Sequence, residues 1–517
     1  MKKTTLFKIA AMLLALVLLT GCAAPAAQNT DAAADAPAAD QTAAAPTEIK
    51  DTFNMQVNSI AYVDPFQTDN AGHAIVYLMT HDRLIEKDLE KGSGYLPGLA
   101  ESWEWTSDNT MEFKLRQGVK FHNGEDLKAD DVVYSLERAR TGNSASKLSS
   151  ILGTEVVDDY TVKMTLDGFN ADIEALLTET FCSICNRKAC EADEINGPSV
   201  GTGPYMVVEF VPADHVNLTR FDGFWGEPVP TKNINIRNIS EDSTALIALQ
   251  NGEMDFVETP IESKPFVDDD ENIEFFAFPC STVVYLAFNT SKGITADRNL
   301  RLAFAHALRY EELAAYTYQE LAQTNPSNWG MTTFGYNDKI EAYEYNQELA
   351  KEYLAKAFPD GNPQMTLQVS TWGPLAEVVQ AQMKEIGMDI QIETLEGAAL
   401  TAMSKYNTAE HTAMISTCGW NLYGDDSRRV YYPGSNVNKA VINDDRISEL
   451  IDLAVKEKDE QKRKEYYGEV QQINHDECYY LPLFCGCNTY SMAKGVTGIK
   501  YAPNGRNDFR YVTVPAK

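Results

Sequence analysis

The sequence has no apolar run long enough to cross a bilayer as a helix, which takes about 20 residues. Its longest apolar stretch, Ile9 to Leu19, is shorter than that. Basic residues are also scarce, since 44 Lys and Arg stand against 75 Asp and Glu, for a formal net charge of −31. Such a chain is a poor partner for nucleic acid or for anionic lipid. These shortages argue against a membrane-spanning protein and against a nucleic-acid-binding protein.

Potential metal ligands are few and scattered. The chain has seven His, and no two of them stand at the helical spacing of a metal-binding pair. Of its nine Cys, the eight that follow the amino-terminal region are not spaced like a disulfide scaffold: Cys182, Cys185, Cys190, Cys280, Cys418, Cys478, Cys485 and Cys487. We expect them to be free thiols. Zinc binding by the first three remains an alternative, weakened because no second half of a zinc motif follows.

The amino terminus has the pattern of an export signal. Two Lys follow Met1, a short uncharged apolar run comes next, and the run ends at Leu19-Thr20-Gly21-Cys22. These last four residues resemble the lipobox of bacterial lipoproteins. By that resemblance, a diacylglyceryl group is attached to the Cys22 sulfur and cleavage makes Cys22 the first residue. The sequence therefore predicts an extracellular protein that a lipid holds at the cell membrane.

The segment after the anchor is almost entirely Ala, Pro, Gln, Thr and Asp. Residues 23–47 contain no aromatic or large aliphatic side chain, so they bury too little surface to offset chain entropy. We predict a disordered stalk there. About 470 residues remain, which exceeds a single typical core and predicts two or three domains.

Strand and helix patterns alternate through the remainder. Apolar residues alternate with polar ones in segments 53–57, 111–115 and 162–166, the period of a half-buried strand. A helix is predicted after Asp130 and Asp131, since acids favour a helix amino terminus. Such alternation of elements is typical of the α/β class.

The clearest unit lies at residues 365–393. Leu367 and Val369 alternate as a strand, and an amphipathic helix then leads to Gly387, placed where a helix end favours a left-handed residue. Met388, Ile390 and Ile392 alternate as a second strand. The segment predicts a βαβ unit and hence a parallel strand pair.

Several motifs, taken in order, resemble the family 5 extracellular solute-binding proteins of ABC importers, which include oligopeptide, dipeptide and nickel binders. They cover roughly residues 50–490. The motifs are Leu96-Pro97-Gly98-Leu99-Ala100-Glu101-Ser102-Trp103, Phe113 to Gly124, Ala129 to Ser135, Gly201-Thr202-Gly203-Pro204-Tyr205, Phe224-Trp225-Gly226, Leu249 to Asp255, Leu286 to Thr290, Met383 to Gly387, and Gly419-Trp420.

The resemblance implies a two-lobed α/β fold like that of the periplasmic binding proteins (class II, cluster C), with an extra domain in the first lobe. It implies a signal peptide (1–21), a stalk (22–47), a lobe 1 core (48–92, 200–279 and 488–517), an extra domain (93–199) and lobe 2 (280–487). A ligand would bind between the lobes, and a hinge motion would close them around it.

The implied function is capture of a small ligand, an oligopeptide first of all, and its delivery to the permease subunits of an ABC importer. No catalysis, cofactor, metal or nucleic acid is implied, and the protein is expected to act as a monomer. A nickel chelate or an oligosaccharide is an alternative ligand for the same fold. A signalling role is equally compatible with the motifs.

The resemblance also points to a site near Gly419-Trp420. In dipeptide-binding relatives, an Asp three residues after the Trp holds the peptide α-ammonium, a charge-assisted bond. This sequence has Tyr423 at that position, and acids follow only at Asp425 and Asp426. Either Asp425 supplies the contact after a local shift or the contact is absent, and a solvated turn is the alternative role for both acids.

Aromatic side chains should line the rest of the cleft. Trp420 and Tyr423 are the first candidates by position, and Trp372 follows a strand end of the βαβ unit. Three further candidates are Tyr62, beside a Val-Asp-Pro stretch that resembles one in the family, and Tyr285 and Asn289, near the start of the second lobe. For each aromatic except Trp420, a core role is an equal alternative.

One motif suggests an enzyme. Gly197-Pro198-Ser199-Val200-Gly201 fits the G-x-S-x-G pattern of serine hydrolases. A nucleophile elbow needs a strand before the Ser and a helix after it, whereas here Pro198 precedes the Ser and a strand is predicted to follow. Serine hydrolysis therefore stays a remote alternative.

Overall fold

The computed structural model describes residues 48–67, 70–88, 94–321, 323–361, 363–424 and 426–516. The predicted signal peptide, Cys22, the stalk and Asp425 lie outside these described residues. Within the described part of the chain, no helix has the length and apolarity that a bilayer crossing requires.

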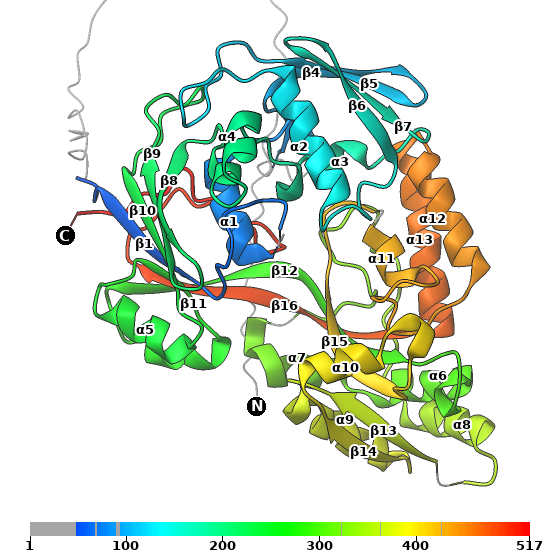
Figure 1. Ribbon diagram of the computed structural model, residues 1–517. Coiled ribbons are helices and arrows are strands. Elements are labelled where there is room, and N and C mark those ends of the chain that lie inside the picture. The colour runs from blue at the N-terminus through cyan, green and yellow to red at the C-terminus, as the bar shows by residue number, and fades with distance from the viewer. Residues whose placement is uncertain are drawn as a thin grey trace, which may run out of the picture. The chain divides into compact units, whose positions relative to one another are not determined.

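A mixed ten-stranded sheet runs through the described part of the chain (Figure 1). β1 pairs in parallel with β10 and β11, and β13 pairs in parallel with β14 and β15. The strand order is β14 (Asp389–Thr394), β13 (Gln364–Val369), β15 (Ala413–Gly419), β12 (Ile273–Phe288), β16 (Tyr480–Ala493), β11 (Phe256–Glu258), β1 (Thr52–Val57), β10 (Asn233–Asn238), β9 (His215–Arg220) and β8 (Tyr205–Val211).

The two longest strands, β12 and β16, lie at the centre of this sheet. They pair antiparallel from Ile273 opposite Ala493 to Ala287 opposite Tyr480, with register breaks between Pro279 and Val283 and next to Val284. Figure 1 shows them side by side, with the β11 side of the sheet at one end and β15 at the other. They therefore connect the two halves of the sheet, which we call the β1 half (β8 to β11 and β1) and the β13 half (β13 to β15).

Two helices belong to the β1 half. The first of these is α1 (Ala71–Thr80), which begins where the Asn70 side chain accepts a hydrogen bond from the backbone N–H of His73, a regular amino-terminal cap. The second is α5 (Asp242–Gln250). The predicted strand 53–57 is confirmed as β1, and the side chains of Phe53, Met55 and Val57 are buried.

A separate four-stranded antiparallel sheet and its helices form what we call the small-sheet domain. Its core consists of the alternating residues that the sequence predicts at 111–115 and 162–166, together with α2. The strand order is β4 (Ala100–Ser107), β5 (Thr110–Leu115), β7 (Thr161–Leu166) and β6 (Ile151–Asp158), and the helices are α2 (Ala129–Thr141), α3 (Ile173–Leu177) and α4 (Arg187–Ala192). A short hairpin of β2 (Ile85–Lys87) and β3 (Tyr95–Pro97) lies beside it in the chain.

The remaining helices belong to the β13 half. The predicted βαβ unit is confirmed as β13, α9 and β14, and Gly387 has a positive φ of 90°. The helices are α6 (Arg298–Ala307), α7 (Tyr310–Tyr318), α8 (Gln347–Ala357), α9 (Gly373–Glu385), α10 (Gly397–Met403), α11 (Asp426–Tyr431), α12 (Asp445–Lys456) and α13 (Glu460–Glu477). Short 3-10 turns are η1 (Thr180–Cys182), η2 (Gly197–Ser199), η3 (Ile261–Phe266), η4 (Ile294–Ala296), η5 (Gln319–Leu321) and η6 (Tyr406–Thr408).

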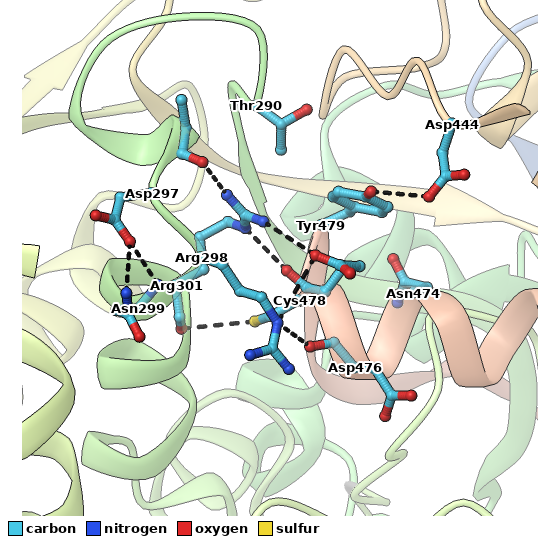
Figure 2. Close-up of polar contacts among 12 residues, drawn as sticks. Thr290, Asp297, Arg298, Asn299, Arg301, Asp444, Asn474, Asp476, Cys478 and Tyr479 are labelled. Atoms are coloured by element: carbon cyan, nitrogen blue, oxygen red, sulfur yellow. Dashed lines mark hydrogen bonds and ion pairs between the residues drawn. The ribbon is translucent and has the colours of Figure 1, made fainter. Parts of the chain in front are cut away.

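The carboxyl end of α13 is fixed by two arginines of α6 (Figure 2). Arg301 is buried and donates from Nε to the Glu477 carbonyl at 3.0 Å and from Nη1 to the Thr295 and Ala296 carbonyls at 2.9 Å. Arg298 donates to the Asp476 carbonyl at 2.7 Å. Cations favour the negative end of a helix dipole, so the two arginines hold the carboxyl end of α13 against α6.

Candidate ligand-binding cleft

A cleft of about 950 Å³ lies between the small-sheet domain and the β13 half. Its lining is rich in charged and hydroxyl side chains, with Phe169 and Tyr423 as its aromatic members. The lining residues are Asp108, Ser146, Lys147, Ser149, Ser150, Asp167, Gly168, Phe169, Asn170, Leu176, Tyr423, Asp426, Arg428, Arg429, Ser435, Val437, Asp452, Val455, Lys456 and Lys458.

The small-sheet wall is built from connections between elements. Asp108 lies in the turn from β4 to β5, residues 146–150 precede β6, and residues 167–170 follow β7. Connecting segments carry polar groups at the surface because their backbone is not paired in a sheet. This wall is consequently polar, and the apolar core of the domain does not line the cleft except through Leu176 and Tyr423.

The opposite wall comes from α11, α12 and the residues just before α11. Tyr423 packs against the core of the small-sheet domain, and its hydroxyl accepts a hydrogen bond from Asn421 Nδ2 at 3.2 Å. The Asp426 carboxylate accepts from the Asn421 backbone and side chain, both at 3.1 Å, and from Arg429 at 3.0 and 2.7 Å. In this structure the Asp426 carboxylate is therefore bonded to its own chain through both oxygens.

Most other charges of the cleft are also paired. Arg428 lies 2.7 Å from Asp452, and Lys458 lies 2.9 Å from Asp108. The hydrogen bond from Lys458 lowers the pKa of the Asp108 carboxyl. These pairs keep the cleft polar without giving it a strong charge of either sign.

Two lining charges differ from the rest. Asp167 and Lys456 are both exposed, and among the described residues neither side chain has a hydrogen-bond or ion-pair partner. Asp167 belongs to the small-sheet wall and Lys456 to the end of α12 on the other wall. The cleft thus offers a ligand one free anion and one free cation from opposite sides.

The two walls also touch directly beside the cleft. The Ala171 N–H donates to the Val455 carbonyl at 2.8 Å, and Arg463 Nη1 donates to the Ala171 carbonyl at 2.9 Å. The carboxylate of Asp172, which is 2% exposed, accepts from Arg463 at 3.3 Å and from the Tyr467 hydroxyl at 3.2 Å. We call this set of five residues the Asp172 contact. It joins α3's amino end to α12 and α13.

The structure brings two of the predicted site residues to the cleft, Tyr423 and Asp426. Trp420 is fully buried and stacked on Trp329, with ring centroids 4.6 Å apart, and is not among the lining residues. In this arrangement it belongs to the core of the β13 half. Binding of ligand by Tyr423 and Asp426 stays a prediction.

Two other predicted aromatics lie elsewhere. Trp372 precedes α9 and packs half-buried against the core around the βαβ unit. Tyr62 is 48% exposed beside His73 and does not line the cleft. Neither residue lines the cleft with Tyr423. Ligand contact by Trp372 or Tyr62 stays a prediction.

The last two candidates, Tyr285 and Asn289, lie in the interior. The Tyr285 ring packs edge-on against Tyr480 within the core. Asn289 Nδ2 donates to the His411 carbonyl at 2.9 Å, and Asn289 Oδ1 accepts from the backbone N–H and the hydroxyl of Ser291. Both side chains are buried in this structure, and ligand contact by either residue stays a prediction.

Sequence reasoning missed Asp167, Lys456 and Asp172. The only available signal was position, since Asp167 directly follows β7, Lys456 ends α12 and Asp172 directly precedes α3. Their partners come from segments far along the chain, with Arg463 lying 291 residues from Asp172.

The enzyme motif lacks its required geometry. Ser199 ends the 3-10 turn η2, and its hydroxyl donates to the Asn196 carbonyl at 2.6 Å. A nucleophile elbow would need a strand immediately before the Ser, and turns and a helix occupy that position instead.

The chain belongs to the bacterial extracellular solute-binding proteins, family 5, whose model matches residues 94–440. It is 28% identical over 482 residues to heme-binding protein A of Haemophilus influenzae (84% of this chain, 87% of the relative). It is 27% identical over 480 residues to the dipeptide-binding protein of Escherichia coli (84% and 89%).

The fold is similar to that of solved binding proteins. With the ABC transporter substrate-binding protein CtaP of Listeria monocytogenes, the TM-score is 0.82 at 22% identity, covering 91% of this chain and 100% of the other. The predicted α/β binding-protein fold is confirmed. The chain is therefore the solute-binding subunit of an ABC importer, acts outside the cytoplasm, and belongs to a family of binding proteins rather than enzymes.

Proposed function

We propose that the protein captures a zwitterionic oligopeptide in the cleft between the small-sheet domain and the β13 half. The observation that carries this proposal is the pair of unpartnered charges on opposite walls, Asp167 and Lys456. A free peptide has an ammonium group at one end and a carboxylate at the other. Charge-assisted bonds to both ends would hold the peptide across the cleft, and the hydroxyl groups of the lining would contact its backbone.

The chemistry of the lining favours a peptide over the other ligands of related proteins. Heme requires an extended apolar slot, and this lining is largely charged and polar. No His lines the cleft among the described residues, which disfavours a histidine chelate of nickel. Oligosaccharides stack on aromatic platforms, and here Phe169 and Tyr423 are the aromatic lining residues. One Escherichia coli relative is a dipeptide-binding protein, in agreement with the proposal.

We propose further that the predicted domains are the moving parts. Residues 48–92, 200–279 and 488–517 would form the first lobe with the extra domain 93–199, and 280–487 the second. The long strands β12 and β16 are the covalent connection between the two, and their register break beside Pro279 is where we place the hinge. Ligand that touches both cleft walls would favour the closed state over the open one.

The remaining predictions concern location. We propose that Cys22 carries the lipid and that the chain works as a monomer on the extracellular face of the cell membrane, or on the periplasmic side in a diderm host. Attachment would keep a high local concentration of loaded receptor beside the permease.

The proposal is tested by a cycle of variants and peptide derivatives. Calorimetry should give roughly five- to tenfold weaker binding of a free peptide to Asp167→Asn, the loss of one charge-assisted bond. The same variant should bind the N-acetylated peptide as the wild type does. Lys456→Gln should show the same behaviour toward the C-amidated peptide.

Asp360→Asn is the matched control, since Asp360 is exposed and does not line the cleft. Its affinity should equal that of the wild type. Mass spectrometry of cargo that co-purifies with the protein gives an independent reading. Binding of heme, a nickel chelate or a sugar, with no peptide bound, would overturn the peptide assignment.

A further inference from the structure

Two buried cysteines of the small-sheet domain lie against each other. The sulfur atoms of Cys185 and Cys190 are 3.1 Å apart. That separation exceeds the ~2.05 Å of a disulfide bond by only about 1 Å. Neither cysteine lines the ligand-binding cleft.

The backbone around the pair is firmly held. Asn186, between the two cysteines, caps α4 by accepting a hydrogen bond from the Ala189 N–H at 2.9 Å. The Cys190 N–H donates to the Asn186 carbonyl at 3.1 Å, and the Cys185 N–H donates to Ser135 Oγ at 3.1 Å. Both sulfurs are therefore presented to each other by an ordered turn, and their proximity follows from the local fold.

Cys182, the third cysteine of this segment, stands apart. It ends the turn η1, is buried in the same core, and forms no hydrogen bond with either thiol among the described residues. No group of three metal-ligating side chains occurs in the described part of the chain. The segment thus presents a pair of thiols, which a zinc ion with its four ligands does not match.

We propose that Cys185 and Cys190 form a disulfide bond in the exported protein. The Cys190 thiolate attacks one sulfur of an oxidising disulfide, such as that of an extracytoplasmic thiol oxidase, and forms a mixed disulfide while the other oxidant sulfur leaves as a thiolate. The Cys185 thiolate then attacks the Cys190 sulfur and releases the second oxidant thiolate. Two protein thiols are oxidised, one oxidant disulfide is reduced, and the two thiol protons pass to solvent or to the leaving thiolates.

Burial sets when this reaction occurs. The exposed fractions are 0% for Cys185 and 2% for Cys190, so an oxidant reaches them before α4 packs. Once formed, the bond fastens α4 to residues 184–186, which lie against the β1 half through the Ile184 N–H and the Asp82 carbonyl at 3.0 Å. Because both sulfur atoms are buried, the disulfide bond would also resist later reduction.

Peptide mapping tests the proposal directly. The full chain is produced by export, its free thiols are alkylated under denaturing conditions, and it is digested with trypsin without reduction. Cleavage after Arg187 and Lys188 separates the two cysteines into peptides 164–187 and 189–220. We expect these peptides to remain joined until a reductant is added.

Matched variants identify the bonded sulfur, since peptide 164–187 also contains Cys182. The link should persist in Cys182→Ser and disappear in Cys185→Ser. The melting temperature of Cys190→Ser should lie about 2–4 °C below that of the wild type in oxidising buffer, which is the expected effect of opening a short disulfide loop. Complete alkylation of both cysteines in the exported protein, or a link that needs Cys182, would overturn the proposal.

Discussion

The small-sheet domain and the β13 half meet at the Asp172 contact, whereas the two halves of the large sheet meet along β12 and β16. The first junction includes a few hydrogen bonds among Ala171, Asp172, Val455, Arg463 and Tyr467. The Lys458–Asp108 ion pair and the packing of Tyr423 against the core of the small-sheet domain add to it. The second is a continuous ladder of backbone pairs between strands of 16 and 14 residues, interrupted beside Pro279.

This difference assigns separate roles to the two junctions. A ladder of backbone bonds with a register break can bend without coming apart. A contact made of a few hydrogen bonds between separate elements can open fully and close again. We therefore expect the strands to act as the hinge and the Asp172 contact to act as the latch, with ligand in the adjacent cleft favouring closure.

The largest effect is expected from Asp172→Ala. The variant leaves Arg463, whose side chain is 14% exposed, without its carboxylate, which costs about 3 kcal/mol in the closed state. Peptide affinity should fall roughly 100-fold because closure contributes to binding. Calorimetry measures this loss, and Tyr467→Phe, which removes the hydrogen bond from the hydroxyl to Asp172, should lose only about fivefold. Unchanged affinity in both variants would show that the contact is no latch.

Arg301→Ala should weaken the support of the latch. The loss of three hydrogen bonds from a buried guanidinium at the end of α13 should lower the free energy of unfolding by about 3 kcal/mol. Arg298→Ala is the control, since that side chain is 47% exposed and its removal should cost under about 1 kcal/mol. Urea unfolding measures both. Equal losses would mean that the Arg301 cluster does not anchor the helix.

Acid should destabilise the fold around His81 and His122. Burial lowers the pKa of His81 to about 3 and of His122 to about 4. Below pH 6.5 the unfolded chain takes up these protons and the folded chain does not, so stability falls as the pH decreases from about 6.5 to 4. At pH 5 each histidine should cost about 2 kcal/mol.

Thermal unfolding at pH 7 and pH 5 measures this dependence. His122→Asn keeps a hydrogen-bond donor for the Gly203 carbonyl and has no titrating group in this range, so its loss of stability on acidification should be smaller. A variant with the same pH dependence as the wild type would contradict the assignment.

The smallest effect is expected at the hinge. A Cβ on Gly486 would lie 2.9 Å from the Tyr318 hydroxyl and 3.4 Å from Cys280 Sγ. Gly486→Ala should therefore destabilise the fold by about 1 kcal/mol as Tyr318 shifts. Gly419→Ala, on the neighbouring strand β15, is the control, because the new Cβ would meet only Thr282 Oγ1 at 3.5 Å, an ordinary contact. The melting temperature of this variant should equal that of the wild type.

Local patterns in the sequence were sufficient to predict much of the fold. The strands at 53–57, 111–115 and 162–166, the helix after Asp130 and the βαβ unit were all found where periodicity placed them. Periodicity succeeds there because neighbouring residues alone decide which face is buried.

The cleft was harder to predict because it depends on which distant segments meet. Tyr423 and Asp426 reached it, but Trp420, an equally good candidate by position, is stacked on Trp329 in the core. Asp172 and Arg463 gave no local signal, since the sheet order that brings α3 beside α13 is a property of the whole chain.

Small-angle X-ray scattering with and without peptide tests the two-junction account most directly. The wild type should become more compact as peptide is added, and Asp172→Ala should need roughly 100-fold more peptide for the same change. A scattering profile that stays the same when calorimetry shows the peptide to be bound would contradict closure around the ligand, and with it the roles of hinge and latch.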